Sequence, residues 1–108
     1  MGDRISVSFT DGSSESVALF SHWGGREFLN DALDYARKLN EKVKENNGHG
    51  PLDRLEPETA MVDFIRHITK RMKVVDSDLY LGKNDNDGDN SDNGHFIVDL
   101  NTGLFKTK

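Results

Sequence analysis

The sequence predicts an α+β fold, namely a two-layer, mainly antiparallel sheet with two helices on one face. Segments near both ends of the chain alternate apolar and polar residues with the period of two that marks strands, whereas two central segments repeat apolar residues at helical spacing. Each helical segment is apolar on one side only, so each covers another layer, most simply the sheet. The resulting order, ββ-αα-βββ, groups the strands together and favours antiparallel pairing over an alternating α/β fold.

A strand is predicted over residues 4–10, followed by a hairpin turn and a return strand over about 15–21. The turn is Asp11-Gly12, because glycine readily adopts the positive φ that tight hairpins need. The return strand contains the unbroken apolar run 17–20, which predicts a central strand covered on both faces. The first strand, in contrast, is expected to be half-buried. Its apolar face would carry Ile5, Val7 and Phe9, and its polar face Ser6, Ser8 and Thr10.

Two amphipathic helices are predicted next, over residues 26–46 and from Pro57 to about Lys73. Asn46-Asn47-Gly48 ends the first helix, since Asn and Gly tolerate the left-handed conformation of a helix cap. Pro57 suits the first turn of the second helix, because a missing N–H costs nothing at that position. The residues between the helices, 47–56, are expected to form a loop.

The C-terminal third of the chain is predicted to form three strands, over residues 74–82, 95–100 and 104–106. Asn101-Thr102-Gly103 supplies a three-residue turn between the last two strands. Residues 84–94 are almost entirely Asp, Asn and Gly, and we expect them to form a flexible hairpin loop. No repeat and no boundary interrupts the pattern, so residues 1–108 are predicted to form one domain.

Composition excludes several classes of protein. The chain has no cysteine, which rules out a disulfide framework, a thiol nucleophile and a zinc ribbon. Its net charge of −5 opposes nonspecific attraction to nucleic acid and to anionic lipid. Its first residues lack the apolar stretch of a signal peptide, and no apolar run is long enough to cross a membrane. We therefore expect a soluble cytoplasmic protein with no nucleic-acid or membrane partner.

His22-Trp23-Gly24-Gly25, at the predicted turn from strand to helix, has two interpretations. In the functional one, the two glycines expose backbone N–H groups at a helix N-terminus to a small anion or other ligand, and His22 adds a proton or a hydrogen bond. In the structural one, Trp23 fills the space between the layers and His22 is satisfied locally. The double glycine lacks the longer spacing of a phosphate loop, so we favour the structural interpretation and predict a mostly buried Trp23.

The same corner carries a resemblance to a known family. The segment 19–25, followed by a helix with Phe28, Ala32 and Leu33, is similar to a pattern in small uncharacterised phage and prokaryotic proteins. In those proteins a strand leads through His-Trp-Gly-Gly into a helix, and an Asp-containing strand comes near the end of the chain. Val98-Asp99-Leu100 would be that strand here. The resemblance implies no activity.

The densest polar constellation lies in residues 84–94. Asp85, Asp87 and Asp89 have the alternate spacing of calcium loops, and Asp92 follows closely. The twelfth position of such a loop would be Phe96 in place of the bidentate glutamate, and strands rather than helices flank the segment. Calcium, if it binds, is therefore expected to bind weakly at these four aspartates, and no other cofactor is predicted. The alternative is a loop of turn-forming residues without metal.

No catalytic motif with a recognisable spacing occurs in the sequence. We therefore expect a non-catalytic binding or interaction module with a protein or small-molecule partner, and a homodimer is compatible with that role. The alternative is a metal-assisted hydrolase that uses His22, His95 and Asp99. His95 and Asp99 would share one strand face, but only the fold could bring His22 to them. The surroundings of His22 and Trp23 are the observation that would best separate the two hypotheses.

Overall fold

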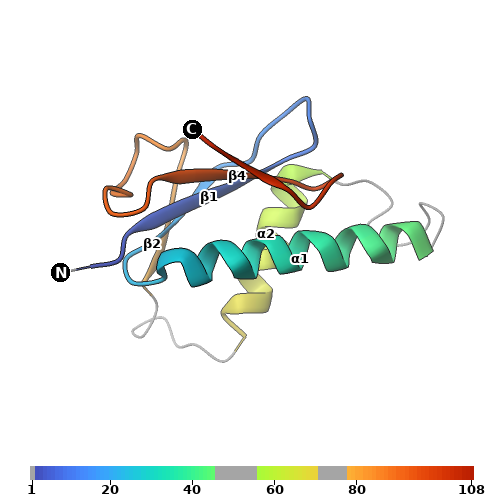
Figure 1. Ribbon diagram of the computed structural model, residues 1–108, viewed down its shortest axis with the longest axis horizontal. Helices are drawn as coiled ribbons and strands as arrows, with labels where there is room; N and C mark the ends of the chain where they lie inside the picture. Colours follow the sequence, from blue (N-terminus) through green and yellow to red (C-terminus); the bar gives the residue numbers. More distant parts are fainter. Residues whose placement is uncertain (1, 46–55, 71–77) are drawn as a thin grey trace.

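The computed structural model, which describes residues 2–45, 56–70 and 78–108, confirms an α+β domain with two helices and a five-stranded sheet (Figure 1). The predicted order of the elements is also confirmed. They are β1 (Ile5–Thr10), β2 (Ala18–Ser21), α1 (Gly25–Glu45), α2 (Pro57–Ile68), β3 (Leu79–Gly82), β4 (His95–Asp99) and β5 (Phe105–Thr107). Residues 71–73 of the predicted second helix and 74–77 of the predicted third strand lie outside the described residues. None of the described helices is long and apolar enough to cross a membrane.

The sheet is mixed, which corrects the prediction of a mainly antiparallel arrangement. Its strand order is β3-β2-β1-β4-β5, and the central pair, β1 and β4, is parallel. The other three pairs are antiparallel, and two of them, β1 with β2 and β4 with β5, are the pairs that the hairpin signals predicted. Val7 at the centre of β1 is opposite Leu19 on one side and Phe96 on the other. The parallel pair joins segments from the two ends of the chain, and no local turn signal specifies such a pairing.

Residues 83–94 connect β3 to β4, and we call them the crossover loop. β3 and β4 run in the same direction with β2 and β1 between them, so the connection is a crossover and not the predicted hairpin. The crossover loop passes over the face of the sheet opposite the helices, where Asn90 donates a hydrogen bond to Ser6 Oγ. Ser6 and Ser8 are consequently fully buried. The prediction that β1 is half-buried was therefore wrong.

Both helices pack on the other face of the sheet, as predicted (Figure 1). The inward side chains of β1, namely Ile5, Val7 and Phe9, share one core with buried residues of α1 and α2. Phe64 of α2 is fully buried at the centre of this core. The unbroken apolar run is also explained, because Leu19 of β2 packs into the core with the helices while Phe20 lies on the other face, against Gly88 of the crossover loop.

Gly88 in the crossover loop lies so close to two aromatic rings that we expect its replacement by alanine to be destabilising. A Cβ at this position would lie 2.7 Å from the Tyr80 ring and 2.8 Å from the Phe20 ring. These rings are stacked with centroids 5.0 Å apart, so neither can move without disturbing the other. Overpacking of this kind costs about 1–3 kcal/mol in the free energy of unfolding, which urea denaturation would measure. Asn86→Ala, at an exposed position of the same loop, is the matched control. An equal loss in the free energy of unfolding in both variants would contradict the close packing of Gly88 against the two rings.

Candidate functional site

At the corner between β2 and α1, the backbone N–H groups that were candidates for anion binding donate to groups of the protein itself. Their hydrogen bonds run from Trp23 to Asp78 Oδ2 (2.9 Å), from Gly24 to Ser21 Oγ (2.9 Å) and from Gly25 to the Asp3 carbonyl (3.0 Å). The Asp3 carboxylate also lies where a Cβ of Gly25 would be. Gly25 has a φ of +56°, so glycine is favoured there for conformational reasons as well. The geometry supports a tightly bonded turn, and it leaves these N–H groups no capacity for an anion.

Trp23 is exposed, with 60% of its surface accessible, so the prediction that it is mostly buried was wrong. The space between the layers that it was expected to fill is occupied by Phe28, which is 6% exposed, and by Phe64. The indole instead lies against the neighbouring His22 ring, with centroids 5.6 Å apart. The hydrogen bonds of the turn direct the Trp23 side chain toward solvent. The four-residue sequence pattern does not indicate this orientation.

The four aspartates of the predicted calcium site have different partners. Their contacts are Asp85 with Lys108 Nζ (3.1 Å), Asp87 with the Lys83 N–H (2.7 Å), Asp89 with Arg4 Nε (3.1 Å) and Asp92 with the Arg4 N–H (2.9 Å). The contacts of Asp85, Asp89 and Asp92 fasten the crossover loop to both ends of the chain, whereas that of Asp87 is within the loop. Across the described ranges, no three His, Asp or Glu side chains come together as metal ligands would. Weak calcium binding and flexibility of residues 84–94 stay predictions.

The three residues of the hydrolase hypothesis occupy separate positions. His95 and Asp99 are at opposite ends of β4, opposite Ser6 and Thr10 of β1, which is a spacing of about 13 Å along a strand. Asp99 Oδ1 accepts the Asn101 N–H (2.8 Å) and so closes the turn before β5. His22 follows β2 and donates its N–H to the Asp78 carbonyl. The fold therefore gives no cluster of these three side chains, and the hydrolase stays a sequence-based hypothesis.

His95 lies at the centre of a buried polar chain that sequence analysis missed. Asn90 Nδ2 donates to Ser6 Oγ (2.9 Å), and Ser6 Oγ contacts His95 Nδ1 at 2.7 Å. On the other side of the ring, His95 Nε2 is 3.1 Å from Ser8 Oγ, which donates to Glu15 Oε2 (2.9 Å). These four partners come from β1, the β1–β2 connection and the crossover loop. Their only sequence signal was the serine alternation in β1, which is typical of a solvent-facing surface.

The directions of these hydrogen bonds determine the tautomer of His95. The Ser8 hydroxyl donates to the Glu15 carboxylate, so Ser8 Oγ accepts the proton that His95 carries on Nε2. His95 Nδ1 then accepts the Ser6 hydroxyl proton, and Ser6 Oγ accepts from Asn90. Every hydrogen in this chain has an acceptor when the imidazole is neutral. Burial agrees with this state, since it lowers the pKa of His95 despite the nearby carboxylates of Asp85 and Glu15.

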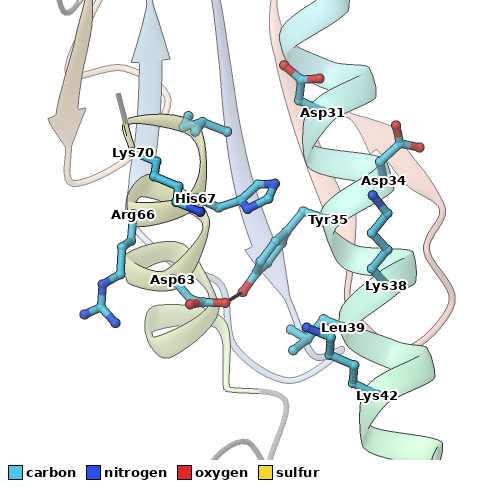
Figure 2. Close-up of a pocket in the computed structure, with 11 residues that line it drawn as sticks. Asp31, Asp34, Tyr35, Lys38, Leu39, Lys42, Asp63, Arg66, His67 and Lys70 are labelled. Carbon is cyan, nitrogen blue, oxygen red and sulfur yellow. Dashed lines mark hydrogen bonds between the residues drawn. The ribbon is translucent and has the colours of Figure 1, made fainter. Parts of the chain in front are cut away.

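A groove of about 650 Å³ lies between α1 and α2, on the outer side of the helical layer. Its apolar residues are Tyr35, Leu39 and Ile68, and its charged residues come from both helices. Figure 2 shows Tyr35 of α1 reaching across to Asp63 of α2, with Lys38 and Lys42 on the same side of α1. The sequence placed Tyr35 and Leu39 in the apolar stripe of a helix, but it could not show that α2 lies beside this part of α1 with a groove between the two helices.

The Tyr35 hydroxyl donates a short hydrogen bond of 2.6 Å to Asp63 Oδ2, which links the two helices at the groove. Burial, together with the Asp63 carboxylate, raises the pKa of Tyr35 far above its ordinary value, so the phenol stays protonated. The ring itself packs against Phe9 and Phe64 in the core. Tyr35 therefore gives the groove a rigid wall with one fixed polar atom.

Comparison of the chain with protein-family models, with curated proteins and with solved structures finds no match. The resemblance of the His22–Gly25 corner to small phage and prokaryotic proteins stays an expectation from the sequence. The geometry of the described residues is therefore the basis for a functional proposal.

Proposed function

We propose that the protein is a non-catalytic binding module whose ligand occupies the groove between α1 and α2. The observation that carries this proposal is the groove itself. Its volume of about 650 Å³ is within the range of small-molecule sites, and it combines the side chains of Tyr35, Leu39 and Ile68 with charged groups from both helices. The Tyr35–Asp63 hydrogen bond holds the two helices at this point without a ligand, as expected for a largely pre-formed site.

The charges on α1 indicate the class of ligand. Lys38 and Lys42 are one turn apart on the groove side of α1, and neither forms an ion pair with any described residue. Asp31 and Asp34 lie nearer the start of the helix, so the wall changes from acidic to basic along its length. An amphiphilic anion fits this arrangement, with its apolar body against Tyr35 and its anionic group at the two lysines.

Anilinonaphthalene sulfonate, which has an apolar ring system and a single sulfonate, is a suitable probe. We expect saturable binding to the native protein, with NMR shift changes concentrated at Tyr35 and Leu39. Lys38→Gln and Lys42→Gln should each weaken binding about two- to fivefold, the range of a single exposed ion pair. Lys106→Gln, an exposed position on β5, is the matched control and should leave the affinity unchanged.

Two results would contradict the proposal. One is a shift pattern centred away from the groove. The other is equal weakening by Lys106→Gln, because this would show only a general effect of net charge.

A further inference from the structure

The crossover loop is joined to the centre of the sheet through Asn90. The Asn90 side chain donates to Ser6 Oγ and also to the Asp85 carbonyl (3.1 Å), so it bonds the sheet and its own loop at once. Other hydrogen bonds join the loop to the rest of the protein, such as those from the Asp89 N–H to Tyr80 Oη (2.9 Å) and from the Asn93 N–H to the Arg4 carbonyl (2.9 Å). Within the loop, the Gly94 N–H donates to the Asn90 carbonyl (2.7 Å).

The central contact depends on the protonation state of His95. In the neutral ring, Nδ1 accepts the Ser6 hydroxyl proton, which leaves Ser6 Oγ as an acceptor for Asn90. A second proton on the ring would turn Nδ1 into a donor, so the Ser6 hydroxyl proton would lose its acceptor. The positive charge would also be buried, because the His95 side chain is only 2% exposed.

The charged groups that face His95 compensate only in part for a buried imidazolium. Glu15, from the β1–β2 connection, is 3.7 Å from Nε2, but it is partly exposed to solvent and already accepts from Ser8. Asp85, from the crossover loop, is paired with Lys108, which follows β5 and has the same sign of charge as the imidazolium. Movement of the crossover loop away from the sheet would bring water to the ring and relieve the burial.

We propose that the crossover loop is a pH-sensitive latch, closed over the sheet while His95 is neutral and released when His95 takes up a proton. An imidazole in the open form would titrate near the ordinary histidine value of about 6.5. The closed form favours the neutral ring, because burial lowers the pKa of His95 in that form. The free energy by which this preference stabilises the closed form is fully present above the pKa of the open form. It is lost as the pH falls from there through the lower pKa of the closed form.

Protonation of Asp85 or Asp89 does not account for a release at mildly acidic pH. Hydrogen bonding by Lys108 lowers the pKa of Asp85, and hydrogen bonding by Ser91 lowers the pKa of Asp89. Both carboxylates therefore stay ionised below the ordinary aspartate value of about 3.9, so their own protonation does not open the loop in mild acid. A change in the loop between about pH 6.5 and 4.5 belongs to a histidine.

Amide hydrogen exchange in metal-free buffer, corrected for the intrinsic effect of pH on exchange, tests the proposal. In the wild-type protein we expect the protection of the Asp89 and Asn93 amides to fall at least about tenfold between pH 7.5 and 4.5, relative to the Val7 amide in the core. The midpoint should coincide with the titration of the His95 ring followed by NMR. His95→Gln, which carries no charge at any pH, should abolish the transition, whereas His22→Gln should retain it.

Unchanged protection in the wild-type protein down to pH 4.5 would overturn the latch, and so would the same transition in His95→Gln. If His95→Gln does not fold, the wild-type titrations decide alone. A loop transition whose midpoint differs from that of the His95 ring would then refute the proposal.

Discussion

Replacement of Phe64 by alanine is expected to lower the free energy of unfolding by about 3–5 kcal/mol. Phe64 is fully buried, and its ring contacts those of Phe9, Phe28 and Tyr35 with centroids 5.3–6.0 Å apart. These rings come from β1, α1 and α2, so the cavity left by the substitution would lie where all three elements meet. The surrounding aromatic side chains are themselves packed by other residues and can fill such a cavity only partly.

Val62→Ala is the matched control, because Val62 is on the same helix but is 57% exposed. It should change the free energy of unfolding by less than about 0.5 kcal/mol, as is typical of surface positions. Urea denaturation followed by circular dichroism measures this free energy for both variants. Similar losses of free energy in the two variants would show that α2 does not pack through Phe64.

Ser6→Ala should be the most destabilising of the substitutions in the buried polar chain. It removes the hydroxyl that donates to His95 Nδ1 and accepts from Asn90. Each buried group left without a partner costs about 1–3 kcal/mol, and the imidazole belongs to a side chain that is only 2% exposed. We also expect faster amide exchange at Asp89 and Asn93, because the loop would lose its contact with the centre of the sheet.

Ser13→Ala removes a hydroxyl of the same type from an exposed turn, where Ser13 Oγ donates to Asp11 Oδ1 (3.0 Å). This substitution should lower the free energy of unfolding by less than about 0.5 kcal/mol. A Ser6→Ala protein as stable as Ser13→Ala would mean that water reaches His95 and that the polar chain is not buried.

The identity of each element could be predicted because the signals are local. The helical spacing of Phe28, Ala32 and Leu39 determines one apolar side of α1, and the alternation of Ile5, Val7 and Phe9 determines one apolar side of β1. A side chain's position in a regular element depends on its near neighbours in the chain, so these faces are encoded within a few turns or strand residues.

The residues of the candidate sites were harder to predict, because their surroundings come from remote parts of the chain. Ser6 and His95 are 89 positions apart, and their contact exists only because β4 pairs in parallel with β1. Trp23 illustrates the same limit, since its N–H donates to the carboxylate of Asp78, which is 55 positions away. The calcium spacing of Asp85, Asp87 and Asp89 says nothing of Arg4 and Lys108, which pair with two of these side chains in the fold.

By itself, the sequence determined two one-sided helices, an alternating first strand and an acidic loop between the third and fourth strands. Only the tertiary structure decided that this loop crosses the sheet, that the serine face of β1 is buried with a neutral His95, and that α1 and α2 leave a groove beside Tyr35. The physical reason is that periodicity specifies which face of an element is apolar. The choice of what covers the other face depends on strand order and on helix packing, which are set by the free energy of the whole fold.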